Sequence, residues 1–125
     1  YIELSVLKTI AGFLNSDGGD LLIGVDDQNN VLGIQNELDL LHKSSTDKMQ
    51  LHLKNLIKDN IGSIFTNFIH TELTKVDDQE IIYVKCDKSD KEVFVKGKDF
   101  YIRSGPSTDK LEGSEVLDYT KSRFN

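Results

Sequence analysis

The fold of this chain is decided by the stretch from Phe13 to Gly33, FLNSDGGDLLIGVDDQNNVLG. Apolar residues at helical spacing lead into it, which predicts an amphipathic helix that ends near Gly18-Gly19. Glycine suits the positive backbone dihedral with which helices often end. Leu21, Leu22, Ile23 and Val25 then form an apolar run that predicts a strand from Asp20 to Val25, and its continuity indicates a central strand that is covered on both faces.

Asp26 and Asp27 follow where this strand meets solvent. An acidic pair at a strand end is a common place for chemistry in α/β proteins, but the same pair can simply begin a turn. The next residues, Gln28-Asn29-Asn30, form turns readily, and the short apolar segment Val31–Ile34 comes after them. We therefore expect an antiparallel hairpin, and the spacing by itself favours the turn over the chemistry.

The rest of the chain alternates helices and hairpins. Ser44, Ser45 and Thr46 offer a helix cap ahead of apolar residues on one face, which predicts a helix from about Thr46 to about Asn60. Hairpin strands are predicted over 67–76 and 80–87, and short strands over 93–95 and 100–102. The segment 104–108 is predicted to be a loop, and 113–123 a closing helix. This order favours a single α+β domain over residues 1–125, with a mostly antiparallel mixed sheet covered by helices.

Composition places the chain among ordinary globular domains. Its 125 residues, 38% of them hydrophobic, suffice for one core, and no apolar run approaches the roughly 20 residues that span a bilayer. No leader precedes a cleavage site, so we expect a soluble domain that suits the cytoplasm. Cys86, the single cysteine, lies in a strand-like run where a buried thiol is ordinary. Because the chain opens on Tyr1 inside a helix, we expect it to be N-terminally incomplete and part of a longer protein.

The net charge of −6 argues against broad attraction to phosphates, but the charge is unevenly spread. From Lys85 to Asn125, nine basic residues face eight acidic ones. Arg103, at a strand end ahead of a Gly/Ser/Thr loop, is the best single candidate for a phosphate contact, with an ion pair as the alternative. Six basic residues could line a locally positive surface, although solvated strand edges protected by lysine explain them at least as well: Lys85, Lys88, Lys91, Lys96, Lys98 and Arg103.

Signatures of known catalytic chemistry are missing from the sequence. It holds no glycine-lysine-serine phosphate loop, no CxxC pair, no HExxH and no nucleophile elbow. His42, His52 and His70 are too scattered to share a metal ion. Asp26 and Asp27 could help to hold Mg²⁺ or Mn²⁺, but a metal site that cuts phosphodiesters needs further acidic ligands nearby.

Several segments together resemble the Schlafen AlbA-like domain family: AGFLNSDGGDLLIGVDD, NNVLGI, IIYVKCDKSDKEVFV and DFYIRSGPSTDKL. The resemblance spans nearly the whole chain, and its most specific piece runs from Ala11 to Asp26. In bacteria the family is known mostly from transcriptional regulators and defence proteins, so the resemblance implies an α/β fold and nucleic-acid binding. An ATP-binding label attached to some members finds no Walker motif here.

The same resemblance raises the question of RNA cleavage. Vertebrate Schlafen proteins cut structured RNA with three carboxylates, two from a Glu-rich segment that ends in Glu-Phe-Lys and one at the second Asp of the GVDD run. Asp27 matches that last position, so the resemblance implies a metal-binding and catalytic role for it. The Glu-rich segment is not in this sequence, and the three-carboxylate site cannot be assembled from its 125 residues.

Three functions remain as hypotheses. The favoured one is a DNA- or RNA-binding module of a longer regulator or defence protein, with phosphate contacts from Gly18, Gly19, Lys96, Lys98, Arg103, Ser107 and Thr108. The second is a metal-dependent endoribonuclease that uses Asp27 together with upstream Glu residues. The third is a protein-interaction or oligomerisation domain, for example a homodimer, that binds no nucleic acid.

Overall fold

The computed structural model describes residues 2–26, 28–34 and 46–124. Its helices are α1 (Ile2–Asn15), α3 (Thr46–Asn60), the short 3-10 helix η1 (Ser63–Phe68) and α4 (Ser114–Phe124). Its strands are β1 (Gly19–Ile23), β2 (Ile69–Val76), β3 (Gln79–Cys86), β4 (Phe94–Val95), β5 (Asp99–Ser104) and β6 (Ser107–Leu111). The helices predicted over 46–60 and 113–123 are confirmed to within one residue at each end.

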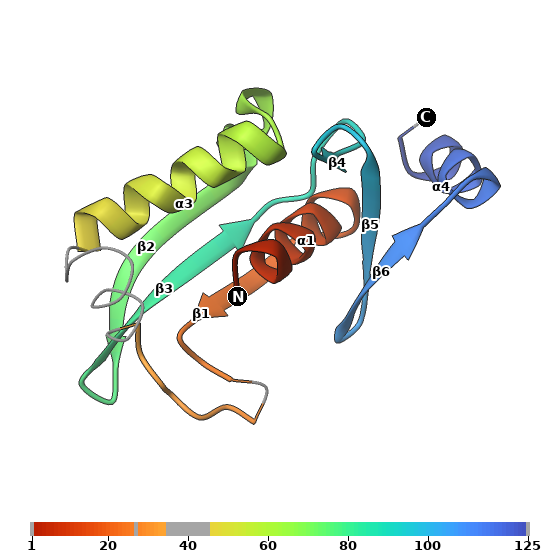
Figure 1. Cartoon of the computed structure of the whole chain (residues 1–125). Helices are drawn as coiled ribbons and strands as arrows, with labels where there is room; N and C mark the ends of the chain where they lie inside the picture. The colour runs from red at the N-terminus through yellow and green to blue at the C-terminus, as the bar shows by residue number, and fades with distance from the viewer. Residues whose placement is uncertain (1, 27, 35–45, 125) are drawn as a thin grey trace.

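The strands form two antiparallel sheets. β1, β3 and β2 make one sheet in that spatial order, and β4, β5 and β6 make the other. Residue pairs that fix the register include Ile23 with Ile82 and Arg103 with Thr108. Figure 1 shows α1 between the two sheets, α3 across the first sheet and α4 beside the second. The α+β class is confirmed, while the single sheet that the sequence suggested is divided in two.

The burial of α1 explains this division. Its buried apolar residues lie along one side of the helix, and near its end Gly12 and Asn15 on the other side are buried too: the apolar residues are Val6, Leu7, Ile10, Ala11, Phe13 and Leu14. The end of α1 is therefore covered on more than one side. Gly12 allows the second sheet to approach closely, since a Cβ atom there would lie 3.3 Å from the carbonyl oxygen of Ile102. On the first sheet, α3 packs with Met49, Leu53 and Ile57, which recur on one helix face.

β1 is not the central strand that the sequence predicted. β3 occupies the centre of the first sheet, with Ile82 and Val84 fully buried, and within the described residues β1 lies at an edge. Ile23 is buried, whereas 44% of Leu22 is exposed. The continuous run predicted cover on both faces, but the face that carries Leu22 is partly open, and an apolar run does not encode which strand gains two neighbours.

Two tight turns set the ends of the hairpins. Between β2 and β3, Asp77 and Asp78 have positive φ angles of 53° and 62°, as a type I′ turn requires. The segment 104–108 was expected to be a loop, but Ser104 pairs with Ser107 across a two-residue turn and β6 follows. The sequence of β6, STDKL, lacks the apolar alternation that marks a strand, so the pattern gave no sign of it.

Asp78→Gly is expected to raise the free energy of unfolding by about 0.5 kcal/mol, because glycine takes the positive φ of this turn without a Cβ penalty. Asp109→Gly is the matched control, since Asp109 lies within β6, where added backbone freedom only weakens a strand. Urea unfolding of both variants measures the difference. Equal losses of stability in the two variants would contradict the role of the turn.

A buried asparagine joins the end of α1 to the second sheet. Asn15 is 0% exposed, and its Nδ2 atom donates to the carbonyl oxygens of Val93 at 2.9 Å and Tyr101 at 2.8 Å. Its Oδ1 atom accepts a hydrogen bond of 2.8 Å from the backbone N–H of Val93. These bonds hold the last turn of α1 against β5, which carries Arg103, and against the residue that precedes β4.

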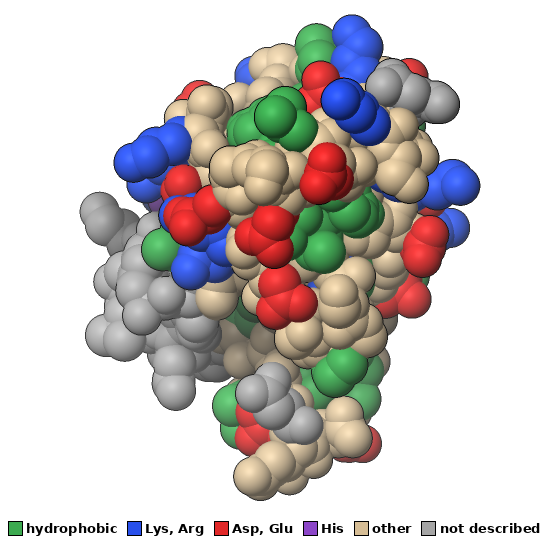
Figure 2. All heavy atoms as spheres, turned by 90° about the vertical axis from the view of Figure 1, so that its right-hand side faces the viewer, with side chains coloured by type: hydrophobic (Ala, Val, Ile, Leu, Met, Phe, Trp, Pro, Cys, Tyr) green, Lys and Arg blue, Asp and Glu red, His purple; other side chains and the backbone are tan. Residues whose placement is uncertain are grey.

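Charged groups of both signs share the surface around α4. Figure 2 looks at this side of the molecule, and lysines, carboxylates and small apolar patches lie close together on it. The net charge of −6 is therefore not gathered into one acidic face on this side. None of the described helices combines the length and apolar character needed to cross a membrane.

Candidate nucleic-acid interface

Arg103 lies near the end of β5, and its guanidinium group is fixed in place. Its Nε atom donates to the carbonyl oxygen of Gly105 at 3.1 Å, and its Nη1 atom donates to the Thr108 hydroxyl at 2.8 Å. The guanidinium also stacks on Phe13, 5.1 Å from the ring centroid. The backbone N–H of Arg103 donates to the Ser16 hydroxyl at 2.9 Å, which joins β5 to the end of α1. Arg103 is thus oriented by its neighbours while its side chain stays partly exposed.

The Phe13 ring beneath Arg103 packs against Gly19. A Cβ atom at Gly19 would lie only 2.4 Å from Cε1 of the ring, so a larger residue at this position would displace the ring. Gly19, Phe13 and Arg103 therefore form a stack that brings the start of β1 to the end of β5. Gly19 contributes to the site by letting the Phe13 ring pack directly against the backbone.

Among the described residues, no carboxylate forms an ion pair with Arg103. Lys110 differs, since its Nζ atom lies 3.3 Å from carboxylate oxygens of both Glu112 and Asp99, and hydrogen bonds to these two groups raise the pKa of Lys110. The ion pair considered as the alternative role of Arg103 is thus not found in the described part of the chain. Its positive charge is available to an anion that arrives from solution.

Gly18 ends α1 in the expected conformation. Its φ angle is +79°, and its N–H donates to the carbonyl oxygen of Phe13 at 2.9 Å. Because this N–H is used within the helix end, it does not serve as a free donor to phosphate. The backbone nitrogen of Lys88 lies 3.2 Å from the position of a Cβ atom on Gly18, and the Lys88 side chain is exposed. A second basic residue therefore borders the Gly18-Gly19 turn.

The hydroxyl groups of Ser107 and Thr108 lie at the same turn as Arg103. Ser107 Oγ donates to the carbonyl oxygen of Ser104 at 3.2 Å, across the turn between β5 and β6. Thr108 pairs with Arg103 in the strand register and accepts its Nη1 hydrogen bond. Both residues thus shape the surroundings of the guanidinium group.

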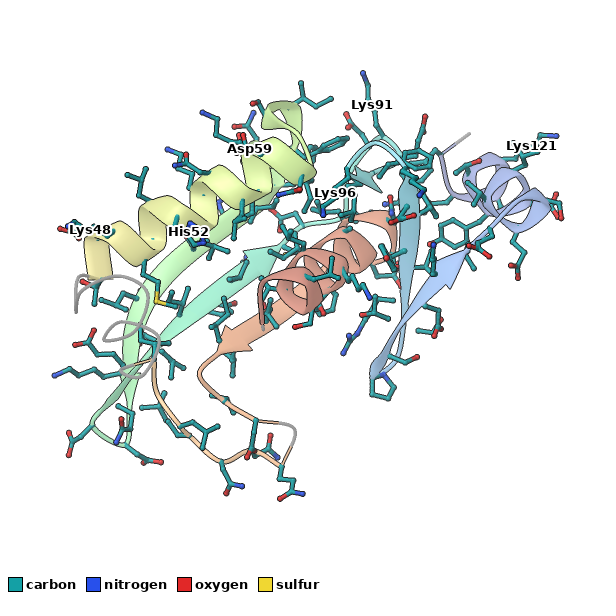
Figure 3. All side chains as sticks on the ribbon, in the orientation of Figure 1. Lys48, His52, Asp59, Lys91, Lys96 and Lys121 are labelled. Atoms are coloured by element: carbon teal, nitrogen blue, oxygen red, sulfur yellow. The ribbon has the colours of Figure 1, made fainter. Side chains whose placement is uncertain are left out.

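Lys96 and Lys98 lie at the opposite end of β5 from Arg103. At about 3.3 Å per residue, the length of β5 places the β4–β5 turn roughly 15 Å away. The N–H of Lys96 donates to the carbonyl oxygen of Asn60 at 2.7 Å, which holds this turn against the end of α3. Figure 3 shows Lys96 near the end of α3, the helix that carries Asp59. The residues proposed from the sequence therefore fall into an Arg103 group and a separate lysine pair.

Asp26 stabilises the turn after β1. Its Oδ1 atom accepts hydrogen bonds from the backbone N–H groups of Gln28 at 2.9 Å and Asn30 at 2.8 Å, and its Oδ2 atom accepts from Asn30 Nδ2 at 3.1 Å. These bonds, those from Asn30 above all, lower the pKa of Asp26. Val25 and Val31 form an antiparallel bridge, which confirms the predicted hairpin. These contacts agree with the interpretation that Asp26 begins a turn.

Asp27 and His42 lie outside the described residues. In the described ranges, no three His, Cys, Asp or Glu side chains lie close enough together to hold a metal ion. His70 lies 3.2 Å from Asp87 on the surface. Cys86 is buried, as expected, and burial raises the pKa of its thiol to about 12, so the thiol is protonated at neutral pH.

Phe13 and Ser16 complete the Arg103 site, although neither is a typical phosphate ligand. Phe13 supplies the surface on which the guanidinium stacks, and Ser16 accepts the backbone N–H of Arg103. Their signal in the sequence is their position in FLNSDGG, beside the glycines that end α1. That the segment meets β5 could not be inferred from the pattern.

The family model described as Schlafen, AlbA_2 matches residues 2–112. The chain belongs to the Schlafen AlbA_2 family. The matched range runs from α1 to the end of β6, so it contains Phe13, Gly19, Arg103 and Thr108. Membership of this family points to a nucleic-acid-related function.

A solved structure shares the fold of this Schlafen AlbA_2 domain. The crystal structure of the DIP2311 protein from Corynebacterium diphtheriae matches 98% of the chain, with a TM-score of 0.68 and 15% sequence identity. The chain spans 22% of the length of the DIP2311 chain, and at this identity the likeness concerns the fold alone. Among curated proteins, no relative matches the chain.

Proposed function

We propose that this Schlafen AlbA_2 domain binds nucleic acid through its phosphates, with Arg103 as the principal contact. The supporting observation is a guanidinium group that Phe13, Gly105 and Thr108 orient and that no carboxylate neutralises among the described residues. A fixed arginine presents paired N–H donors that match phosphate oxygens. In a longer regulator or defence protein, such a domain would hold the whole protein on nucleic acid.

The acidic net charge sets the expected strength of this binding. With a net charge of −6, few cations can gather against the phosphates, so we expect weak binding with a strong dependence on salt. Lys88 adds a second positive charge beside the Gly18-Gly19 turn. Lys96 and Lys98 would contact only a strand long enough to reach the other end of β5.

Arg103→Ala is expected to weaken nucleic-acid binding about tenfold, because it removes a charge-assisted phosphate contact. The loss should be similar for oligonucleotides of different sequence, since phosphate contacts position a strand without reading its bases. Fluorescence anisotropy with labelled DNA and RNA oligonucleotides, in a series of salt concentrations, measures the affinity. The slope of the logarithm of affinity against the logarithm of salt should fall by about one charge.

Lys110→Ala is the matched control, because Lys110 lies two residues from Thr108 but is already paired with Asp99 and Glu112. It should change affinity less than about twofold. The double variant Lys96→Ala with Lys98→Ala should weaken binding of long oligonucleotides more than that of short ones. Equal losses for Arg103→Ala and Lys110→Ala, or an affinity that salt does not change, would contradict the proposed interface.

A further inference from the structure

α4 follows the range that the family model matches. That range ends at residue 112, and α4 begins at Ser114. None of the residues of α4 is fully buried, so apolar packing alone does not explain its position. One contact with the core comes from the ring of Tyr119, which meets Phe100 edge-on, 5.9 Å between centroids. Phe100 lies on β5, so α4 is attached to the strand that carries Arg103.

The Tyr119 hydroxyl sets the direction of the Ser16 hydroxyl. Tyr119 donates its proton to the carbonyl oxygen of Asn15 at 2.7 Å, and its oxygen lies 3.4 Å from Ser16 Oγ. Because this proton is used on Asn15, Ser16 is the donor in the contact between the two hydroxyls. The Ser16 oxygen then keeps its lone pairs for the backbone N–H of Arg103, which donates to it at 2.9 Å. A chain of two hydrogen bonds thus joins Tyr119 to the backbone of Arg103.

Arg123 offsets the negative charge at the end of α1. The last carbonyl groups of a helix have no partner within it and carry the negative end of its dipole. Arg123 donates from Nη2 to the carbonyl oxygen of Leu14 at 3.3 Å and from Nε to that of Ser16 at 3.2 Å. The guanidinium of Arg103 stacks on Phe13, in the last turn of the same helix. Without Arg123, the negative helix end would therefore repel a phosphate bound at Arg103.

The same side chain holds the segment that carries Lys88, the second basic residue of the proposed interface. Nη2 of Arg123 also donates to the carbonyl oxygen of Ser89 at 2.8 Å. The backbone N–H of Ser89 in turn donates to the carbonyl oxygen of Leu14 at 2.8 Å. An anchor for a helix could lie anywhere on the surface, whereas these contacts converge on the residues that position Arg103 and Lys88.

We propose that Tyr119 and Arg123 are positioning residues of the phosphate site, so that α4 supports nucleic-acid binding without contacting phosphate itself. Tyr119 fixes the Ser16 hydroxyl that holds the backbone of Arg103, and Arg123 offsets the negative end of α1 beside it. The inference rests on the proposed function, nucleic-acid binding at Arg103. It assigns a role to residues beyond the range that the family model matches.

Tyr119→Phe is expected to weaken oligonucleotide binding about threefold, less than Arg103→Ala does, because it removes a support and not a phosphate contact. Phenylalanine keeps the ring against Phe100, so the fold should persist, and circular dichroism checks this. In the Arg103→Ala background the same change should cause no further loss, since no guanidinium is left to position. Fluorescence anisotropy of the two single variants and the double variant measures this coupling.

The backbone amide of Arg103 gives a measurement that needs no nucleic acid. In Tyr119→Phe the Ser16 hydroxyl is free to turn away from Arg103, so this amide should exchange its hydrogen at least about threefold faster. The amide of Ile82, in the centre of the first sheet, is the reference and should be unchanged. The comparison separates a local change at Arg103 from a loss of global stability.

Arg123→Gln is expected to weaken binding about threefold at low salt, because it removes the cation from the end of α1. Lys121→Gln is the matched control. It removes the same charge from the last turn of the same helix, but Figure 3 shows Lys121 pointing outward from α4. This control should change affinity by less than about 1.5-fold, because solvent and salt screen an outward charge.

The outcomes distinguish this inference from the proposed function. Additive losses for Tyr119→Phe and Arg103→Ala, an unchanged exchange rate of the Arg103 amide, or equal losses for Arg123→Gln and Lys121→Gln would overturn the inference and leave the proposed function standing. A protein that binds no oligonucleotide at low salt would overturn the proposed function, and the inference with it.

Discussion

Asn15→Leu is expected to lower the free energy of unfolding by about 3–5 kcal/mol, a large part of the total stability of a domain of this size. Leucine fills a similar volume, but it leaves the N–H and the carbonyl of Val93 and the carbonyl of Tyr101 without partners. Val93 is 0% exposed and Tyr101 is 7% exposed, so water does not take the place of the lost amide. Each unsatisfied buried group costs about 1–3 kcal/mol.

Urea unfolding followed by circular dichroism measures this change. Asn55→Leu is the matched control, because Asn55 lies on the exposed side of α3 and the same replacement there should change stability by less than about 0.5 kcal/mol. If Asn15→Leu cost no more than Asn55→Leu, the three hydrogen bonds of Asn15 would not be what holds α1 to the second sheet.

The sequence predicted the elements whose signals are local. The Ser/Thr cap and the spacing of Met49, Leu53 and Ile57 were enough to place α3, because a helix depends on residues a few positions apart. The turn chemistry of residues 77–79 likewise placed the β2–β3 hairpin. The edge position of β1 was missed because strand order depends on pairing between distant segments.

In the candidate site, too, the features that depend on neighbouring residues could be predicted, and those that depend on contacts between distant segments could not. Arg103 could be singled out from its place at a strand end, and the positive φ of Gly18 from its place at a helix end. The stack of Gly19, Phe13 and Arg103 could not, because it depends on how closely the end of α1 approaches β5. The separation of Lys96 from Arg103 follows from the length and direction of β5, which residue types do not state.

Gly18→Val is expected to lower the free energy of unfolding by about 3 kcal/mol or more, because two costs add at this position. The φ angle of +79° lies in a region that β-branched residues rarely adopt. A Cβ atom would also lie 2.6 Å from the carbonyl oxygen of Cys86. That oxygen belongs to the backbone of the central strand β3, and Cys86 pairs with Gly19, so the backbone cannot move away without breaking the sheet.

Gly113→Val separates the two costs. Gly113 has a φ angle of +59°, but a Cβ atom there would meet nothing within 4 Å, so this variant should show only the cost of the backbone conformation, about 1–2 kcal/mol. Urea unfolding of both variants gives the difference, which measures the contact between the end of α1 and β3. Equal losses in the two variants would mean that β3 yields at Cys86, and that the end of α1 is held by the Asn15 hydrogen bonds and not by the close approach of Gly18.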